Sequence, residues 1–211
     1  LTQTTADGVY DHGRVALAQN GAFGTAPRLV RMRAAGVILA TGALDRPITF
    51  DGNDRPGVMS LMGAAEMLAR YGVLVGTRLA VAANHSMGDG AAAFLADAGA
   101  EITFFDPAAA PLRAYAGRQV TGLEHAGRKR VFDAVLVSGG LPPLVHLWRH
   151  AGGKLDWDET RQAFLPGAAP EGMRVVGAAN GTFDFEAALD EARALGQVSR
   201  PSTFYHLTPL W

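Results

Sequence analysis

The sequence predicts an α/β fold of two lobes, and three features support this prediction. Residues 37–40 (Val-Ile-Leu-Ala) form a continuous apolar run, which is typical of a strand buried on both faces of a parallel sheet, and small residues follow at 41–43. Residues 79–106 contain a strand, a small-residue turn, a helix and a second strand. A further buried strand at 131–137 ends in Ser-Gly-Gly at 138–140.

Proline breaks predict where the chain passes between the lobes. The dipeptides Arg46-Pro47 and Arg55-Pro56 follow the first apolar run closely, and Leu141-Pro142-Pro143 follows the last. Proline excludes the preceding residue from helical conformations and is common in linkers. We therefore predict one domain from residues 1–56 and 141–211, and a second domain inserted at 57–140.

Composition excludes several classes of function. The 211 residues carry a net charge of -1 and lack a basic cluster, so nucleic acid and membrane surfaces are not expected partners. The absence of cysteine excludes disulfides, thiolate metal sites and cysteine nucleophiles. His146 and His150 are four residues apart, but no carboxylate or cysteine completes a ligand set, so we predict no metal site. No apolar run is long enough to span a membrane, and we expect a cytoplasmic protein.

Alternation and helical spacing predict the elements of the first half. Residues 1–20 alternate, which predicts two strands around a turn at Asp7-Gly8, and a third strand is expected at 29–33. Apolar residues at helical spacing predict a helix over 57–71.

The segment 79–106 has the order of half a Rossmann fold. Its strand (79–83), turn (84–90), helix (91–99) and strand (101–105) would place helix N–H groups toward a diphosphate, and Asp106 would accept hydrogen bonds from a ribose. However, Ala83, His85 and Gly88 stand where Gly-x-Gly-x-x-Gly is expected. Side chains at the first two positions keep a diphosphate away from the backbone. A working dinucleotide site and a lobe retained for packing therefore both stay open.

The remaining elements follow from shorter patterns. We expect a strand at 119–124, a turn at Ala126-Gly127, the buried strand at 131–137, and an apolar helix or turn from 145 to 148. Residues 152–167 resemble a hairpin, 173–176 a strand and 185–195 a helix. The proline-interrupted residues 204–211 predict a tail that leads to a further domain.

Two segments carry a resemblance to a known family. Residues 37–47 (VILATGALDRP) and 50–60 (FDGNDRPGVMS) resemble the ATG segment of flavoprotein oxidoreductases with two dinucleotide domains, the flavoprotein disulfide-reductase type. They look closest to the α subunit of heterotetrameric sarcosine oxidase and its amine- and opine-oxidising relatives. The resemblance runs from about Val9 to Trp211. It implies a first lobe that lacks its first strand and glycine-rich turn, so we expect an interior piece of a longer subunit.

The same resemblance suggests where a nucleotide binds. Residues 173–181, with the helix after them, resemble the third flavoprotein motif, but the position expected to be acidic is neutral in Ala178-Ala179-Asn180. Asn180 could supply part of the missing hydrogen bonding, and NAD or another adenine nucleotide matches better than FAD. The cofactor-binding residues implied are Ala40, Thr41, Gly42, Arg46, Gly139, Gly177, Asn180, Gly181 and Phe183. We expect the corners at 41–42 and 177–181 to border one groove.

The resemblance implies a function that the isolated chain would not perform alone. We expect the nucleotide-binding part of an α subunit whose assembly oxidises a secondary amine on the flavin of a partner subunit, with FMN near the subunit contact. No acidic and basic residues lie at a spacing in the sequence that indicates general acid–base catalysis, so no catalytic residue is assigned. One alternative is a dinucleotide-binding or docking module without chemistry of its own. Another is a stand-alone NADH-dependent reductase, which Ala83 and His85 disfavour.

Overall fold

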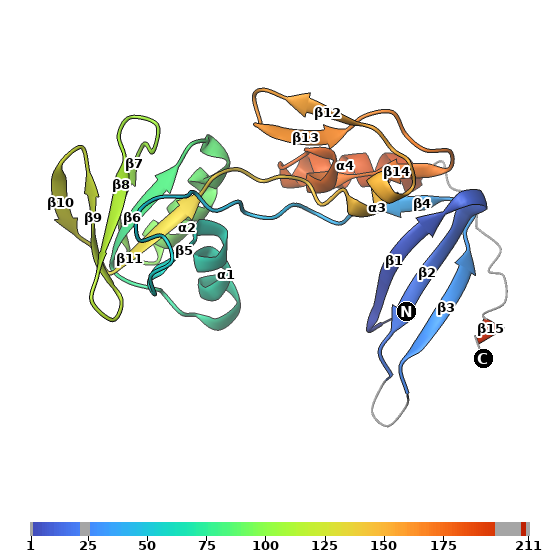
Figure 1. The fold of residues 1–211 in the computed structure, drawn as a ribbon, viewed down its shortest axis with the longest axis horizontal. Helices are drawn as coiled ribbons and strands as arrows, with labels where there is room; N and C mark the ends of the chain where they lie inside the picture. The colour runs from blue at the N-terminus through green and yellow to red at the C-terminus, as the bar shows by residue number, and fades with distance from the viewer. Residues whose placement is uncertain (1, 22–25, 197–207, 210–211) are drawn as a thin grey trace. The chain divides into compact units, whose positions relative to one another are not determined.

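The chain folds into two compact units. The computed structural model describes residues 2–21, 26–196 and 208–209 (Figure 1). Unit 1 comprises Leu1–Ala43, Pro143–Glu159 and Ala163–Trp211, and unit 2 comprises Leu44–Pro142 and Thr160–Gln162. Helices combined with parallel sheets confirm the predicted α/β class. The sequence-based domain limits, residues 1–56 with 141–211 and the inserted 57–140, stay predictions.

Unit 1 contains an antiparallel sheet in the order β1-β2-β3-β15. Its strands are β1 (Thr4–Tyr10), β2 (Arg14–Gln19), β3 (Arg28–Arg33) and β15 (Thr208–Pro209). Of the predicted tail at 204–211, only β15 lies within the described residues.

The predicted turn at Asp7-Gly8 is wrong. Strand β1 continues through this dipeptide with a register shift between Ala6 and Gly8, and the chain reverses at the 3-10 turn η1 (Asp11–Gly13). Gly13 has a φ of +70°, and a Cβ there would collide with the backbone oxygen of Ala34. Only glycine fits this position. The packing of Ala34 against Gly13 therefore accompanies a turn at Asp11–Gly13, and not at Asp7-Gly8.

A parallel pair of strands, a two-stranded hairpin and three helical segments complete the main body of unit 1. These are β4 (Val37–Leu39), α3 (His146–His150), the hairpin β12 (Leu155–Asp158) and β13 (Ala163–Pro166), β14 (Met173–Val175), the 3-10 turn η3 (Gly177–Asn180) and α4 (Phe185–Gly196). Trp148 is at the centre of the core, packed with Val9, Leu39 and Met173. Ile38 in β4 is 53% exposed, so the prediction that this strand is buried on both faces is wrong for the residues described.

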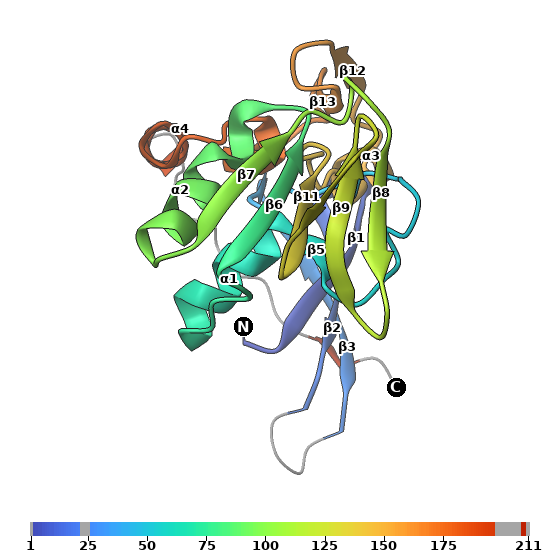
Figure 2. The same ribbon diagram turned by 90° about the vertical axis from the view of Figure 1, so that its left-hand side faces the viewer.

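Unit 2 is built on a four-stranded parallel sheet in the order β5-β11-β6-β7. Its elements are β5 (Val58–Ser60), α1 (Leu61–Tyr71), β6 (Arg78–Ala83), the 3-10 turn η2 (Ser86–Gly88), α2 (Asp89–Asp97), β7 (Glu101–Phe105), β8 (Leu112–Ala116), β9 (Val120–His125), β10 (Arg128–Val131) and β11 (Ala134–Ser138). Helices α1 and α2 pack on one face, and the small sheet β10-β9-β8 packs on the other (Figure 2).

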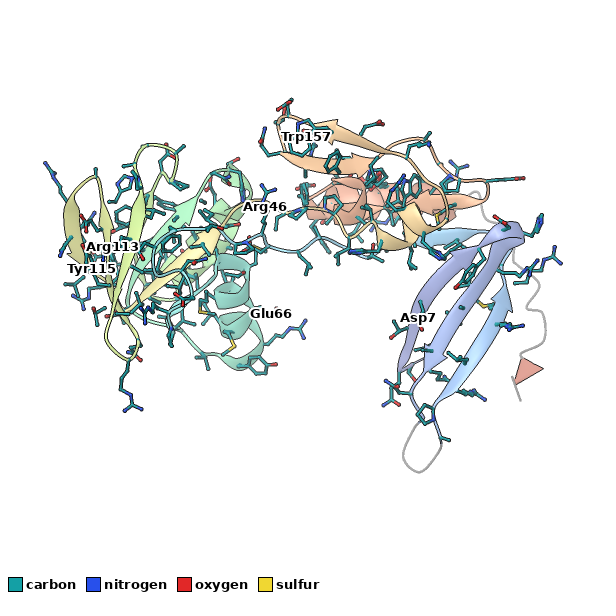
Figure 3. All side chains as sticks on the ribbon, viewed as in Figure 1. Asp7, Arg46, Glu66, Arg113, Tyr115 and Trp157 are labelled. Carbon is teal, nitrogen blue, oxygen red and sulfur yellow. The ribbon has the colours of Figure 1, made fainter. Side chains whose placement is uncertain are left out.

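Three short strands of unit 2 were not predicted, each for a physical reason. Strand β5 was included in the predicted helix 57–71, but that helix begins at Leu61 because the Ser60 hydroxyl caps it by accepting from the Gly63 N–H at 3.0 Å. Strand β10 (Arg-Lys-Arg-Val) is exposed at all four positions, and such a charged edge strand lacks the apolar alternation that identifies a strand in sequence. Strand β8 is an edge strand of five residues, in which exposed Arg113 (Figure 3) lies between buried Leu112 and Ala114, and this stretch is too short to stand out in the sequence.

Asp133 ties the start of β6 to the start of β11. Its Oδ2 accepts from the backbone N–H groups of Thr77 (3.0 Å) and Arg78 (2.8 Å) and from the Thr77 hydroxyl (3.0 Å). Its Oδ1 accepts from the Arg78 guanidinium at 3.1 Å. Led by the backbone N–H of Arg78, these donors lower the pKa of Asp133 from 3.8 to about 2.

The helices of the described chain are short. The longest, α4, has 12 residues, and no helix among the described residues combines the length and apolar character needed to cross a membrane.

Replacement of Trp148 should destabilise unit 1 selectively. The ring is 2% exposed, and its Nε1 donates to the Lys154 carbonyl at 2.7 Å. Trp148→Phe removes this bond and buried volume, so the free energy of unfolding should fall by about 1–3 kcal/mol in urea titrations followed by circular dichroism. Trp157→Phe is the matched control, because Trp157 is 45% exposed on the β12 hairpin (Figure 3). Equal effects of the two substitutions would contradict this assignment of the core.

Asp133 should make unit 2 sensitive to acid. Its folded pKa lies below its unfolded value of 3.8, so its contribution to stability is complete above about pH 4 and is lost as the pH falls toward 2. Asp133→Asn should flatten the decline in unfolding free energy over this range. The measurement is urea unfolding at a series of pH values. An unchanged slope in the variant would exclude this role.

Candidate nucleotide site

Two small-residue corners of unit 1 follow neighbouring strands. β4 and β14 are parallel, with Leu39 opposite Val175, and the Val176 N–H donates to the Leu39 carbonyl at 2.9 Å. Residues 40–43 and 177–181 therefore leave the sheet at the same edge. In open α/β sheets, ligands bind outside the carboxyl ends of the strands.

The corner after β4 leaves its backbone open to approach. Gly42 has a φ of +74°, and no atom lies within 4 Å of where its Cβ would be. Ala40 and Thr41 are exposed. The Thr41 hydroxyl donates to the Leu144 carbonyl at 2.6 Å, and the Leu144 N–H donates to the Gly42 carbonyl at 2.9 Å. The corner is thus held in place by the returning chain while its outer side can be approached closely.

The corner after β14 is the turn η3, and a helix side chain organises it. Gly177 and Gly181 both have positive φ, +67° and +81°. Glu191 of α4 accepts the Gly177 N–H on Oε2 at 2.7 Å and the Asn180 side-chain amide on Oε1. Sequence analysis found the neutral turn but missed Glu191. The available signal was an acidic residue on the helix that follows.

The predicted residue Phe183 lies between η3 and α4 and is half-buried. Directly after it, Asp184 caps α4. Its carboxylate accepts from the Ala187 N–H at 2.9 Å, and its carbonyl accepts from the Ala188 N–H at 3.0 Å. Two backbone N–H groups in the first turn of this helix therefore have acceptors within the chain.

The other two predicted residues, Arg46 and Gly139, belong to unit 2 and bind each other. The Arg46 guanidinium donates from Nε to the Gly139 carbonyl at 2.9 Å and from Nη1 to the Gln162 carbonyl at 3.2 Å. The Gly139 N–H donates back to the Arg46 carbonyl at 2.6 Å. A Cβ at Gly139 would lie 2.9 Å from that oxygen, so close backbone contact explains this glycine.

Unit 2 has a second cluster of polar groups where its parallel strands end. Ser138 is fully buried at the end of β11 and donates to Asp45 Oδ1, while His85 Nε2 lies 3.1 Å from Ser138 Oγ. Because the single hydroxyl proton goes to Asp45, His85 is the donor to Ser138. Asp45 Oδ2 accepts from the Ser60 hydroxyl at 2.8 Å and from the Met62 N–H at 3.2 Å.

This cluster does not fit a dinucleotide at the turn after β6. A diphosphate needs backbone donors facing an open turn, yet the His85 side chain bonds to the end of the adjacent strand. Gly88, at the third position of the expected glycine pattern, packs against Leu61, whose Cδ2 is 2.7 Å from where a Cβ would be. Asp106 caps its own turn, accepting from the Ala108 N–H at 2.8 Å.

Burial dominates the titration of His85. It lowers the pKa of the imidazole below 6.5, Asp45 opposes this, Arg46 lowers the pKa further, and Asp89 opposes again. The neutral ring therefore prevails around neutral pH, consistent with one N–H donor directed at Ser138.

A large cavity of unit 1 lies at the opposite ends of the strands. Its volume is about 890 Å³, and it includes Val37 and Met173, the first residues of β4 and β14. Tyr10, Arg33 and His150 also line it. The candidate nucleotide edge therefore rests on backbone geometry and hydrogen bonding, and this cavity is a separate feature.

Solved structures identify the class of fold. The chain superposes on L-proline dehydrogenase from P. horikoshii with a TM-score of 0.70 and 23% identity, over 97% of this chain and 45% of that one. It superposes on a NAD-dependent persulfide reductase from A. fulgidus with a TM-score of 0.68 and 16% identity, over 94% and 44%. The fold is an α/β dinucleotide-binding fold. No protein-family model matches the chain.

Sequence comparison gives particular relatives. The chain is 33% identical to sarcosine oxidase subunit alpha of Corynebacterium sp. (strain P-1), over 93% of this chain and 24% of that protein. It is 34% identical to sarcosine oxidase subunit alpha of Rhizobium meliloti (strain 1021), over 92% and 23%. The resemblance predicted from residues 37–60 is confirmed. The chain spans about a quarter of the length of these relatives, whose names mark them as parts of multi-subunit enzymes.

His85 should titrate below 6.5 in the folded protein, as followed by its imidazole resonances in NMR. Asp45→Asn should lower the pKa further, because it removes the carboxylate that favours the charged ring. Asp89→Asn is the matched control, since Asp89 is exposed and its smaller effect has the same sign. A pKa above 6.5 in the wild-type protein would show that burial does not control this ring.

Proposed function

We propose that this chain is the nucleotide-binding part of the α subunit of a sarcosine oxidase-like oxidoreductase. In this proposal NAD or FAD binds at the carboxyl edge of β4 and β14. The parallel pairing of these strands supports the proposal most directly, because it brings the corners at 40–42 and 177–181 to one edge. The sequence similarity to sarcosine oxidase subunit alpha supports the proposal that this chain is part of a multi-subunit oxidoreductase.

The residues of this edge fit a nucleotide in two ways. Gly42 lets a ligand approach the backbone closely, since a Cβ there would meet no atom within 4 Å. Asn180 and Glu191 provide acceptor oxygens beside the second corner. When bound, a nicotinamide or flavin group supplies hydride-transfer chemistry. The role of this chain is to bind and orient the nucleotide. In unit 2, the hydrogen bonds between Arg46 and Gly139 hold together the two segments to which these residues belong.

The wider assembly follows from the relatives and forms part of the same proposal. We propose oxidation of a secondary amine on the flavin of a partner subunit, with FMN at a subunit contact and a cytoplasmic location. The partners are other subunits and the small amine, with neither nucleic acid nor membrane among them. No catalytic group is assigned to this chain.

A second candidate is a docking module without chemistry or cofactor. It is favoured by the closed network of His85, Ser138 and Asp45, which occupies the place where unit 2 of a reductase would hold a dinucleotide. The same network argues against a stand-alone NADH-dependent reductase.

Cofactor analysis distinguishes these candidates. The purified chain is titrated with NAD and with FAD by calorimetry, and mass spectrometry of the denatured supernatant identifies any nucleotide that co-purifies. We expect binding of one nucleotide, and Gly42→Val should weaken it at least tenfold by obstructing the backbone. Gly127→Val is the control for backbone strain, because Gly127 has a φ of +73° and open space around it in unit 2.

Absence of any bound or binding nucleotide would favour the docking module. The proposal also expects no oxidation of sarcosine by this chain alone. Measurable peroxide production from sarcosine without other subunits would contradict it.

A further inference from the structure

The outer face of the antiparallel sheet in unit 1 gathers three arginines. Strand β2 buries Val15 and Leu17 in the core, so the alternate residues of β2 and of its partner β3 stand on the opposite face of the sheet (Figure 1). On that face Arg14 of β2 lies directly opposite Arg33 of β3, and Arg31 stands two residues before Arg33. All three arginines are exposed. We call this surface the arginine face.

The arginine face has no acid of its own to balance it. Within the described part of the chain, Arg14, Arg31 and Arg33 form no ion pair and no side-chain hydrogen bond. Asp7 of β1 and Asp11 of the turn after it do not pair with them either. Like charges directly opposite each other on one face of a sheet are destabilising. An external carboxylate would relieve this repulsion.

Exposed apolar side chains accompany the three cations. Tyr10 of β1 lies opposite Arg14 and is 54% exposed, and Leu29 of β3 is 59% exposed. A Cβ at Gly8 would lie 2.9 Å from the ring of Tyr10, so the ring packs closely on the backbone of its own strand. Arginine and tyrosine are enriched at protein–protein interfaces and supply many of the residues that dominate binding there.

The cavity of about 890 Å³ adjoins the arginine face. Tyr10 and Arg33 line it together with His150, whose ring meets that of Tyr10 edge to face with 4.9 Å between the centroids. Buried Val9 and Met173 contribute an apolar part of the lining. A chain lying across the face therefore has room to place a side chain in this cavity.

We propose that the arginine face binds an acidic segment of a partner protein chain, whose carboxylates pair with Arg14, Arg31 and Arg33. A guanidinium holds a carboxylate by two parallel hydrogen bonds. Three arginines on a chain of net charge -1 give no wide positive field for nucleic acid. Exposed Tyr10 and Leu29 favour a protein segment over a free anion. This surface is independent of the proposed nucleotide function, because none of its residues belongs to the candidate nucleotide site.

A synthetic acidic peptide tests the proposal on the whole chain. Fluorescence anisotropy follows a labelled peptide of alternating glutamate and threonine, and a glutamine–threonine peptide is the neutral probe. Only the acidic peptide should bind, and added salt should weaken its binding. Arg31→Gln and Arg33→Gln should each weaken it by about threefold or more. Arg28→Gln is the matched control, because exposed Arg28 lies on the same strand and donates to Gln19 at 2.7 Å.

Several outcomes would overturn the proposal. These are equal binding of the two peptides, no binding by the wild-type chain, and equal effects of Arg28→Gln and Arg33→Gln. Tighter binding of a single-stranded oligonucleotide, or displacement of the peptide by inorganic phosphate at the same concentration, would assign the face to another kind of anion. Self-association in sedimentation velocity that Arg33→Gln abolishes would make a second copy the occupant. The substituted arginines are exposed, so the variants should keep the fold, which circular dichroism checks.

Discussion

The parallel pairing of β4 with β14 is the constraint on which the candidate site depends. The two strands are separated by more than a hundred residues of chain, and their register, together with the Val176 N–H bond to Leu39, brings two glycine corners to one edge. Parallel strands require long crossover connections, and here unit 2 is part of that connection. Without this register the two corners would not lie at a common edge of the sheet.

Both units fill anion-accepting positions with their own side chains. In unit 1, Glu191 takes the N–H of Gly177, and in unit 2, Asp45 takes the N–H of Met62 at the start of α1. A carboxylate satisfies a helix-terminal donor and interacts favourably with the helix dipole, so each contact stabilises its turn. The same contact occupies a backbone N–H that could otherwise donate to an anion.

The two units differ in what remains for a ligand. At the edge of unit 1, Gly42 keeps its backbone open, and Asn180 retains an acceptor beside a charged carboxylate. At the corresponding edge of unit 2, His85 hydrogen-bonds to buried Ser138, which donates to Asp45, so the side chain after β6 is engaged by the end of β11. This contrast is why the nucleotide is proposed for unit 1, although unit 2 has the more complete parallel sheet.

The sequence by itself determined the α/β class and the resemblance carried by residues 37–60. It also determined the strands β3, β4, β6, β7 and β14 and the helix α4. These features could be predicted because apolar runs, glycine turns and sequence motifs are local properties of the chain. It also showed that Ala83 and His85 replace glycines. Only the tertiary structure decided that the chain reverses at Gly13 instead of Gly8, that Ile38 is exposed, and that Glu191 reaches back to Asn180. These outcomes depend on which distant groups meet: the oxygen of Ala34 over Gly13, and a helix side chain over the preceding turn. The spacing of residues along the chain does not indicate which of these distant groups come into contact.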